Sequence, residues 1–470
     1  MNLRLSLAIL AGKTAAWLSR LRGHKGSSLP GLVAMKVYPG TLRELARQVR
    51  KGSIVTSGTN GKTTTSNMIA DVLAASRYRI IANREGANLI TGVTTAFIRS
   101  AGLGGRIKCD YAVLEVDEAS MPGVLAQVRP TLVVLTNFFR DQLDRYWELD
   151  KITGIIRDSL LRHKHTTLVL NADDPLVAQF SRTTGLPSVF YGLGGHEVVR
   201  RSSTQTREAK FCPFCGSPLA YDFFHYGQLG SYRCPGCDFR RPAARVEALE
   251  PKMVDRAMGC RLLFDRKEVS LLIQVQGLYN LYNALAAFTV GLQLGLDAPS
   301  VLESLRRYRP ATGRMEEFKF NNKPAYLILV KNPTGFNEAL AALHAGEGNK
   351  DVFIAINDND ADGRDISWLW DVDFEVLGAD HGQLLHFTCS GRRGEEMALR
   401  LKYAGVPGEK ISVSPDLQTA IKEALDGRGT AAYLFCTYTA LWPAHEIVRQ
   451  LADKEGVDSD QGVSSLSRPA

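Results

Sequence analysis

Apolar residues along the first half of the chain alternate between short continuous runs and helical periodicity. Four apolar runs fall between residues 41 and 200, and a helical pattern over 63–75 follows the first of them. The runs are KGSIVTS, DYAVLEVDE, TLVVLTN and HTTLVLNADDP. Because buried strands separated by helices form parallel sheets with helices on both faces, this region predicts an α/β domain.

A change of pattern between about 205 and 245 interrupts this rhythm. The apolar periodicity is lost there, and Cys, Pro and Gly cluster instead. Strand and helix patterns return over about 246–312, so we interpret the interruption as a module inserted into the first domain. A second group of buried-strand patterns follows, consisting of AYLILVKNP, DVFIAIND, HFTCSG and AAYLFCTY. It predicts a second, doubly wound α/β domain after a short linker.

These patterns divide the chain into four parts. We expect a basic amphipathic segment at 1–40, a first α/β domain at 41–312 with its insertion at about 205–245, a C-terminal α/β domain at 313–453 and a disordered tail at 454–470. Lys13 interrupts the apolar stretch of the first segment, which makes it a poor signal peptide. We favour a helix packed on its own domain, with a helix on a membrane surface as the alternative.

Composition narrows the class of protein only slightly. The 470 residues are 45% hydrophobic and 23% charged, as in a soluble globular protein, and no window approaches 18 uninterrupted apolar residues. The formal net charge of +8 is compatible with an anionic partner such as a nucleic acid, a phosphorylated substrate or a membrane surface. The net charge alone does not distinguish among these three kinds of partner.

A glycine-rich loop gives the strongest chemical signal. The sequence TSGTNGKTT at 56–64 follows an apolar run and opens a helical pattern, which is the context of a phosphate-binding loop. Small residues let backbone N–H groups turn toward phosphate oxygens, and the helix N-terminus adds its dipole. We expect Lys62 to reach the β- and γ-phosphates of ATP and the Thr63 hydroxyl to bind Mg²⁺. The loop residues expected to contact the nucleotide are Gly58, Thr59, Asn60, Gly61, Lys62, Thr63 and Thr64.

Two further features bear on this ATP site. A strict Walker motif has glycine where this chain has Thr56, so a chance G-K-T-T turn is the alternative. A magnesium site also needs a carboxylate at the end of a neighbouring strand. Glu115, near the end of the DYAVLEVDE run, is our first choice and Glu118 the second, although each is also compatible with an ordinary exposed carboxylate.

Four of the eight cysteines form two C-x-x-C pairs. The pair Cys212 and Cys215 is separated from the pair Cys234 and Cys237 by 18 residues, which fits the spacing of a four-thiolate zinc site. Two matched pairs argue against a redox pair, and four protein ligands leave no open position, so we predict a closed structural Zn²⁺ site in a reducing compartment. The remaining cysteines, Cys109, Cys260, Cys389 and Cys436, are interpreted as ordinary buried residues.

An acidic segment in the second domain begins like a calcium-binding loop. Asp358, Asp360, Asp362 and Gly363 match D-x-D-x-D-G, but the twelfth position is Leu369 and a strand pattern precedes the loop. Calcium binding is therefore the weaker interpretation. A solvated acidic loop remains a competing one.

The phosphate loop and four downstream segments together resemble the Mur ligase superfamily. The downstream segments are NFFRDQLDRY at 137–146, NADDP at 171–175, GLYNLYNA at 277–284 and GRME at 313–316. Gln142 stands where the family has a histidine. The resemblance implies an ATP-dependent ligase that uses Mg²⁺, in which Lys62 and Glu115 act in catalysis. It further implies Asn171 near the adenine, Asn283 in the nucleotide site, and Arg314 approaching the ATP phosphates from the domain hinge.

Within the superfamily, the four-cysteine insertion and the segment NDNDADGRDISW at 357–368 are most similar to ligase subunits that work with a separate glutaminase. This similarity implies amidation of the D-glutamate α-carboxylate of lipid II, a lipid-linked peptidoglycan precursor, to D-isoglutamine through an acyl phosphate. It also implies a heterodimer with a GatD-like glutaminase subunit that supplies ammonia, in the cytoplasm or at the inner face of the membrane.

The aspartate offered to that partner's catalytic triad is assigned to Asp362, with Asp358 and Asp365 as alternatives. The cysteines agree with an external ammonia source, because none outside the two pairs lies in the G-x-C-x-G setting of a glutaminase nucleophile.

Two other functions fit parts of the pattern. A Mur or folylpolyglutamate-type ligase that adds an amino acid would share the ATP site, and a zinc-ribbon ATPase that binds nucleic acid would share the basic charge. The basic residues are scattered, however, and the insertion lacks a dense aromatic and basic face. We therefore expect no nucleic acid partner.

Overall fold

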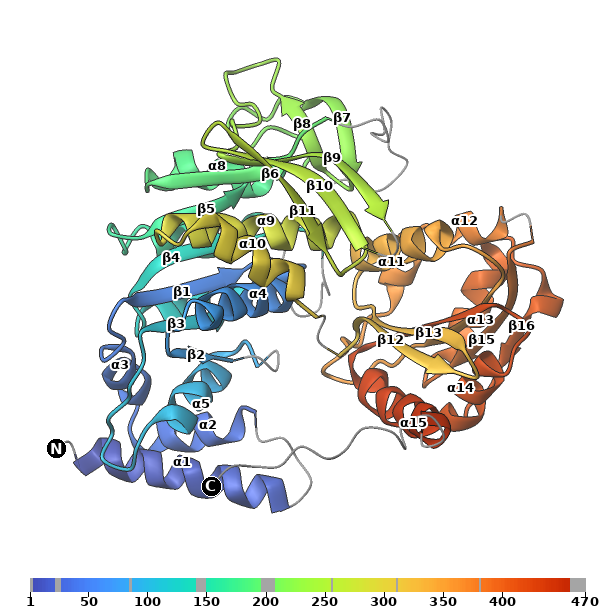
Figure 1. Ribbon diagram of the computed structural model, residues 1–470, viewed down its shortest axis with the longest axis horizontal. Coiled ribbons are helices and arrows are strands. Elements are labelled where there is room, and N and C mark those ends of the chain that lie inside the picture. The colour runs from blue at the N-terminus through green and yellow to red at the C-terminus, as the bar shows by residue number, and fades with distance from the viewer. Residues whose placement is uncertain are drawn as a thin grey trace. The chain divides into compact units, whose positions relative to one another are not determined.

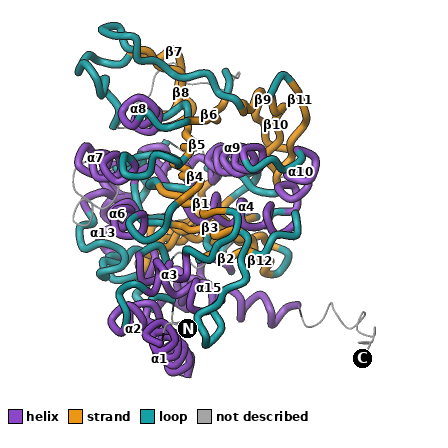
Figure 2. The backbone as a smooth tube through the Cα atoms, turned by 90° about the vertical axis from the view of Figure 1, so that its left-hand side faces the viewer, coloured by secondary structure: helices purple, strands orange, loops and turns teal. Residues whose placement is uncertain are grey.

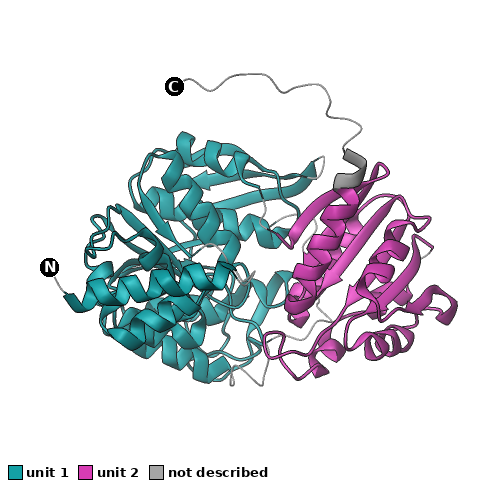
Figure 3. Cartoon of the chain, turned by 90° about the horizontal axis from the view of Figure 1, so that it is seen from below, with its two compact units in different colours: residues 1–140, 146–309 teal, residues 141–145, 310–470 magenta. Residues whose placement is uncertain are grey.

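The computed structural model describes residues 3–21, 27–83, 87–140, 149–195, 208–254, 257–309, 312–379 and 382–456. The chain divides into two units, residues 1–140 with 146–309 and residues 141–145 with 310–470 (Figure 3). The break after residue 309 lies near the boundary predicted at 312–313. Each unit has its own sheet and its own hydrophobic core.

A nine-stranded sheet forms the centre of the first unit (Figure 1). Its strands are β1 (Gly52–Ser57), β2 (Ile80–Ala82), β3 (Tyr111–Glu115), β4 (Pro130–Leu135), β5 (Thr167–Asn171), β6 (Ser188–Leu193), β9 (Val246–Val254), β10 (Ala257–Phe264) and β11 (Lys267–Ile273). Their order is β11-β10-β9-β6-β5-β4-β1-β3-β2. The pairs from β2 to β9 are parallel, and β10 and β11 extend the sheet in antiparallel fashion.

Helices cover both faces of this sheet because its central strands are apolar on both sides. Successive side chains of β1 point to opposite faces, so Ile54 and Val55 belong to different cores. The core of Ile54 is covered by α4 (Lys62–Ala75), α9 (Leu278–Gln293) and α10 (Ala298–Arg307). The core of Val55 is covered by α5 (Ile90–Ser100), α6 (Met121–Leu125), α7 (Leu149–Leu160) and α8 (Pro175–Thr184). Figure 2 shows the strands between α9 and α10 on one side and α6 and α7 on the other.

Three N-terminal helices extend the core on the Val55 face. They are α1 (Leu3–Leu21), α2 (Leu29–Val37) and α3 (Thr41–Ala46). Leu5 and Ala8 of α1 are buried in the same cluster as Phe97 of α5. Gly31 of α2 lies so close to α5 that a Cβ there would meet the Thr91 carbonyl oxygen at 1.9 Å. The described residues of the segment 1–40 are therefore packed into the first unit.

The segment predicted as an insertion leaves the sheet after β6 and returns at β9. It contains a hairpin of β7 (Ala220–Tyr226) and β8 (Leu229–Arg233), which pair antiparallel as a separate two-stranded sheet. A small core that includes Leu219, Tyr232 and Phe239 packs the insertion against Ala178 of α8.

The second unit is built on a six-stranded sheet. Its strands are β12 (Arg314–Phe320), β13 (Lys323–Leu329), β14 (Lys350–Ala355), β15 (Leu384–Ser390), β16 (Ile411–Val413) and β17 (Ala431–Cys436), in the order β12-β13-β17-β14-β15-β16. All pairs except β12 with β13 are parallel. The helices α11 (Pro333–Ala345), α12 (Glu375–Gly378) and α13 (Gly394–Tyr403) cover one face, and α14 (Leu417–Leu425) and α15 (Tyr438–Gly456) cover the other.

The tail predicted to be disordered at 454–470 lies outside the described residues from 457 onward. Across the described part of the chain, no helix combines the length and the apolar character needed to cross a bilayer.

Candidate functional site

The glycine-rich loop connects the end of β1 to the start of α4, and sterics explain both of its glycines. Gly58 and Gly61 have φ angles of +122° and +85°, a region that side chains with a Cβ rarely adopt. A Cβ at Gly61 would meet the Asn283 Oδ1 atom at 2.2 Å, and one at Gly58 would meet the Thr136 Oγ1 atom at 2.4 Å. The loop can therefore lie this close to its neighbours only with glycine at these two positions.

Residues that follow β4 hold the loop in place through hydrogen bonds. The backbone N–H of Thr59 donates to the Asn137 carbonyl oxygen at 2.8 Å, and the N–H of Asn60 donates to Asn137 Oδ1 at 2.9 Å. The Thr136 hydroxyl donates to the Asn60 carbonyl oxygen at 2.8 Å. These bonds fix the conformation of the loop from the end of β4. Asn60 and Asn137 are 77 residues apart in the sequence.

Lys62 begins α4, and its ammonium group turns back over the loop. Its Nζ atom donates to the carbonyl oxygens of Gly58 at 2.5 Å and Thr59 at 3.2 Å. It also forms an ion pair of 3.2 Å with Glu118, which lies in the short helix η1 (Glu118–Ser120) after β3. Both side chains are only 7% exposed, so the charge of each depends on the other.

Glu115 ends β3, beside Thr56 of β1 in the sheet register. The side chain of Asn83 fixes its backbone, accepting from the Glu115 N–H at 2.9 Å and donating to the Glu115 carbonyl oxygen at 2.7 Å. The Glu115 Oε1 atom accepts from Asn88 Nδ2 at 3.3 Å, whereas the buried Oε2 atom has no hydrogen-bond partner among the described residues. A buried carboxylate oxygen left open in this way fits a site for a divalent cation.

Asn283 of α9 contacts the loop and the first turn of α4. Its Oδ1 atom accepts from the Thr65 hydroxyl at 3.1 Å, and its Nδ2 atom donates to Asn280 at 3.3 Å. Together with its steric contact at Gly61, these bonds make Asn283 part of the wall of the loop.

Asn171, at the end of β5, is fully buried, and both of its polar atoms are bonded within the protein. Its Nδ2 atom donates to the Thr136 carbonyl oxygen at 3.0 Å, and its Oδ1 atom accepts from the Asp173 N–H at 3.0 Å. Asn171 thus supports Thr136, which in turn holds the loop. The expected position of Asn171 near the adenine remains a prediction.

The hairpin of the insertion forms a hydrogen bond with the backbone next to Asn137. Gln228, in the turn between β7 and β8, donates to the Phe138 carbonyl oxygen at 2.5 Å. Asp174 accepts from the Phe138 N–H at 2.9 Å and also caps α8 through the Leu176 N–H at 2.9 Å. Burial raises the pKa of Asp174 to about 7. The backbone N–H of Phe138 is thus held by Asp174, from the NADDP segment, and its carbonyl oxygen by Gln228, which no sequence motif marked.

Asp173 is buried and bonds to three separate parts of the first unit. Its buried carboxylate pairs with Arg241, accepts from the Tyr282 hydroxyl at 2.7 Å and accepts from the Leu193 N–H at 2.7 Å. These partners come from the insertion, from α9 and from β6. The carboxylate therefore fixes the insertion to the domain that carries the loop.

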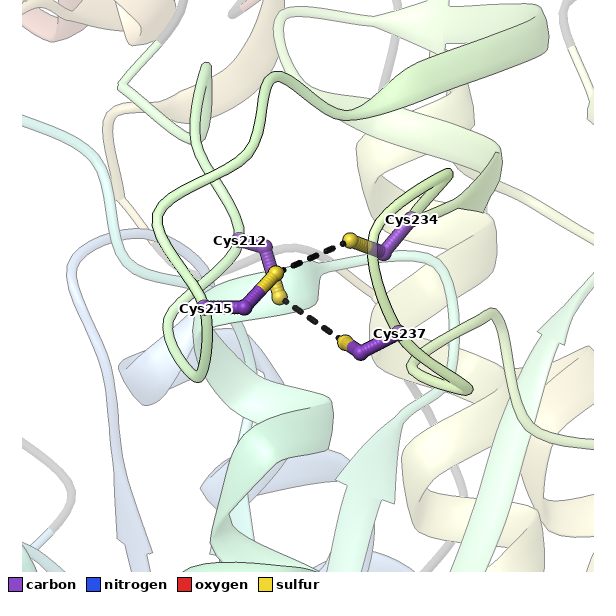
Figure 4. A group of neighbouring side chains, drawn as sticks. All are labelled: Cys212, Cys215, Cys234 and Cys237. Carbon is purple, nitrogen blue, oxygen red and sulfur yellow. Dashed lines mark hydrogen bonds between the residues drawn. The ribbon is translucent and has the colours of Figure 1, made fainter.

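The four paired cysteines converge in the insertion, as Figure 4 shows. Their sulfur atoms all lie within 4.8 Å of one another, with 3.6 Å between Cys212 and Cys237 and 3.4 Å between Cys215 and Cys234. Hydrogen bonds with Ser217 lower the pKa of the Cys215 thiol to about 6. Four thiols at this spacing are a donor set that suits one tetrahedral zinc ion.

The other cysteines lie apart from this cluster and are buried. Burial raises the pKa of the Cys260 and Cys389 thiols to about 12 and that of Cys109 to about 11. Thiols in this state are poor nucleophiles.

The acidic loop after β14 does not gather its carboxylates around one point. Asp362 is buried, and its carboxylate accepts from the Thr439 N–H at 2.7 Å, from the Thr439 hydroxyl and from the Asn359 N–H at 3.2 Å. Asp358 pairs with Arg393 at 2.6 Å. The remaining two aspartates, Asp360 and Asp365, bond to Arg364 and Ser367 respectively.

Comparisons with known proteins agree with this architecture. The profile of the Mur ligase middle domain matches residues 55–230, and that of the MurT ligase C-terminal domain matches residues 329–441. The chain is 40% identical over 439 residues to the lipid II isoglutaminyl synthase (glutamine-hydrolyzing) subunit MurT of Staphylococcus aureus strain N315, covering 93% of this chain and 96% of that one. It is 34% identical to the subunit of the same name from Streptococcus pneumoniae strain ATCC BAA-255 / R6, covering 97% and 100%.

The chain belongs to the MurT family of Mur ligases. The resemblance drawn from its sequence motifs is confirmed.

Solved structures show the same fold at lower identity. A pseudomurein peptide ligase type C from Methanothermus fervidus superposes with a TM-score of 0.66 at 22% identity, covering 87% of this chain and 80% of that one. The MurF ligase from Thermotoga maritima in complex with ADP gives 0.61 at 12% identity, covering 90% and 85%. The predicted α/β class, with a parallel-sheet Mur ligase-like domain, a C-terminal sheet domain and a four-cysteine cluster, is confirmed.

In this MurT-family chain, the residues predicted for the phosphate site come from both units. Gly58, Lys62 and Asn283 meet at the loop of the first unit, where Thr63 is half-buried and Thr64 is buried in the first turn of α4. Arg314 begins β12 and belongs to the second unit, so its approach to the phosphates remains a prediction. Gln142, noted in place of the family histidine, lies outside the described residues.

Proposed function

We propose that this chain is the ATP-dependent ligase subunit that amidates the D-glutamate α-carboxylate of lipid II to D-isoglutamine in peptidoglycan synthesis. The observation that carries the proposal is its similarity, over nearly the full length, to two chains named as subunits of lipid II isoglutaminyl synthase. The glycine loop with its buried lysine supplies the ATP chemistry that such a reaction requires.

The first step would place ATP on the loop between β1 and α4. The N-terminus of α4 and the Lys62 ammonium would bind the β- and γ-phosphates, and Lys62 would stabilise the charge on the phosphoryl group during its transfer. Thr63 and the open Oε2 atom of Glu115 would hold Mg²⁺, which neutralises phosphate charge when bound. Glu118 forms an ion pair with the Lys62 ammonium in its buried position.

The chemistry then proceeds in two displacements. An oxygen of the substrate carboxylate attacks the γ-phosphorus of ATP, ADP leaves, and an acyl phosphate forms. The nitrogen of ammonia attacks the acyl carbon, the carbon–oxygen bond to phosphate breaks, and the amide forms as the nitrogen loses its extra proton. No protein nucleophile takes part, so the protein contributes positioning and charge stabilisation. We expect Arg314 of the second unit to add positive charge at the phosphates.

The cysteine cluster is assigned a structural zinc ion. Four protein thiolates fill a tetrahedral site and leave no position for a reacting water, which separates this role from catalysis. The ion would stabilise the insertion, whose hairpin in turn holds Phe138 beside the phosphate loop.

A GatD-like glutaminase subunit is the proposed partner and source of ammonia, in a heterodimer. The relatives named above are described as glutamine-hydrolyzing, yet the cysteines outside the cluster are buried here and poor as nucleophiles. We propose that Asp362 orients the partner's catalytic histidine, with Asp358 and Asp365 as alternatives. Thr439 fixes the Asp362 carboxylate through two hydrogen bonds, as a positioning role requires.

The amine that is used separates this proposal from ligation of an amino acid. We would measure phosphate release from ATP with the purified chain and lipid II, adding ammonium or individual amino acids in parallel. Ammonium should stimulate release and amino acids should not. Stimulation by an amino acid alone would assign the chain to the amino-acid-adding ligases instead.

A lipid-linked substrate would place the reaction in the cytoplasm, at the inner face of the membrane.

A further inference from the structure

The N-terminal helix α1 is apolar on two opposite faces. One face is buried against the first unit and includes Leu5, Ala8, Gly12, Ala15 and Ser19. The other face holds six side chains that are between 48% and 70% exposed, namely Leu3, Leu7, Leu10, Trp17, Leu18 and Leu21. At about 100° of rotation per residue, these six lie within a sector of roughly 100° opposite the buried face. Core packing explains the first face but not the second.

The neighbouring helix α2 adds to this exposed apolar surface. Leu29, Leu32 and Val37 are 46%, 42% and 48% exposed. Of the 23 large apolar side chains that are exposed in the described part of the chain, nine lie in α1 and α2. The two helices hold only 19 and 9 residues, so this density is far above that of the rest of the surface. Apolar side chains gathered in this way mark a surface that meets another apolar surface.

The charge of the N-terminal segment itself is of one sign. The first 43 residues contain seven Lys or Arg residues and no Asp or Glu, whereas the whole chain contains 57 basic and 49 acidic residues. The remaining 427 residues therefore carry 50 basic and 49 acidic residues, and the N-terminal segment supplies +7 of the net charge of +8. By helical position, Arg4 flanks the exposed stripe of α1 on one side, and Lys13 and Arg20 flank it on the other.

We propose that this α1–α2 face, defined by the nine exposed residues of α1 and α2 named above, binds the surface of an anionic lipid bilayer. Leucine and tryptophan side chains would enter the boundary between headgroups and acyl chains, while the flanking cations would meet anionic headgroups. A second copy of the chain is disfavoured as the occupant, because two such faces would bring like charges together. The helix would lie in the plane of the surface, held from behind by its buried face.

The inference deepens the proposed function, because it places the ligase where a lipid-linked substrate is found. Only the biological purpose of membrane binding rests on the proposed ligase function. The binding itself follows from exposed apolar area and charge, and it requires neither ATP nor turnover. Concentrating enzyme and substrate on one surface raises the effective concentration of each for the other.

Vesicle flotation with the full chain tests the proposal. Vesicles of phosphatidylglycerol and phosphatidylcholine are compared with vesicles of phosphatidylcholine alone, at low and high salt. The wild type should float with the anionic vesicles and less with the neutral ones, and salt should weaken its binding. A double variant, Leu10→Gln with Trp17→Gln, should bind at least about tenfold more weakly, because it removes apolar contact without touching the core. The matched control, Leu161→Gln with Leu399→Gln, changes residues that are 45% and 50% exposed elsewhere and should bind like the wild type.

Three results would overturn the proposal. The first is a wild type that does not float with anionic vesicles, and the second is a Leu10 and Trp17 variant that floats as well as the wild type. The third is a variant that keeps its thermal unfolding temperature but loses a dimer or the glutaminase complex seen with the wild type, which would make the face a protein interface. The wild type and the Leu10 and Trp17 variant should ligate a water-soluble substrate analogue at equal rates. Failure of the ligase proposal can therefore be told apart from failure of the membrane-binding proposal.

Discussion

Single residues at the phosphate loop are coupled by burial. Lys62 and Glu118 are both about 7% exposed and lie 3.2 Å apart, so removing one takes a buried ion-pair partner from the other. The proposed catalytic role of Lys62 and its role in stability therefore need separate tests.

Substitution of Lys62 by alanine should affect activity and stability in different ways. We expect ATP-dependent ligation to fall by on the order of 10²–10³-fold, because a charge that stabilises the transferring phosphoryl group is lost. The free energy of unfolding should also fall by about 3–5 kcal/mol, because Glu118 loses its partner. Denaturant unfolding and steady-state kinetics measure the two effects.

The matched double variant, Lys62→Ala with Glu118→Gln, separates these roles. It should recover most of the lost stability, since the buried carboxylate that has lost the Lys62 ammonium is replaced by a neutral amide, but it should remain inactive. Turnover near the wild-type rate in either folded variant would refute the assignment of Lys62 to the ATP site.

The loop itself could be predicted because its glycines, lysine and threonines are adjacent in sequence and carry a recognisable spacing. Asn137, which holds the loop, lies in a segment that the family resemblance marked, but two more distant supports could not be predicted in the same way. Asn83 is 32 residues from Glu115, which it holds, and Gln228 is 90 residues from Phe138, which it holds. Ordinary polar side chains at such separations carry no local signal, and only the folded chain brings them together.

Secondary-structure elements position the loop through the insertion as well as through the sheet. The hairpin β7–β8 holds the peptide of Phe138 through Gln228, and the cysteine cluster at its base holds the hairpin to its own small core. Apolar runs predicted the central strands, because parallel strands buried on both faces read as continuous apolar sequence. The paired cysteines marked the insertion, but its contact with the loop had no pattern in the sequence.

Removing the hairpin contact should weaken nucleotide binding without removing any residue of the loop. In Gln228→Ala the Phe138 carbonyl oxygen loses a buried donor, which should lower the free energy of unfolding by about 1–3 kcal/mol. We also expect the KM for ATP to rise. The control Ser231→Ala, on the same hairpin but in an exposed bond with Asp222, should stay within about 0.5 kcal/mol of the wild type. Equal KM values for ATP in both variants would contradict a role of the hairpin in positioning the loop.

Metal analysis tests the zinc assignment. Purified wild type should contain about one zinc ion per chain if the four thiolates bind it. Cys212→Ser and Cys237→Ser should lower zinc content and thermal stability together, whereas Cys260→Ala, at a buried cysteine outside the cluster, should keep its zinc. Wild-type protein that is free of metal and has four titratable thiols in the cluster would rule the site out.

The whole molecule combines a ligase domain with a second domain whose acidic loop is proposed to serve a partner. The sequence placed this loop after a strand, and β14 does precede it. Sequence alone could not show that the four aspartates of the loop bond to four different groups, with Asp362 turned inward to Thr439.

A substitution in this loop should separate two sources of ammonia. Asp362→Asn should leave ligation driven by added ammonium nearly intact and sharply reduce ligation driven by glutamine, because the partner's histidine would lose its orienting carboxylate. Asp360→Asn, at an exposed residue that pairs with Arg364 within the described part of this loop, serves as the control and should leave both rates unchanged. If the two rates fall together in Asp362→Asn, the loop serves the ligase site. If neither falls, the aspartate is Asp358 or Asp365, or the loop has no part in the reaction.

The identity of the product is the sharpest test of the proposed amidation. Lipid II is incubated with the purified chain, ATP, Mg²⁺ and ammonium, and the precursor is then analysed by tandem mass spectrometry. We expect conversion of the D-glutamate α-carboxylate to an amide, dependent on ATP and accompanied by one ADP for each amide formed. ATP hydrolysis with unchanged lipid II, or an amide at a different carboxylate, would contradict it.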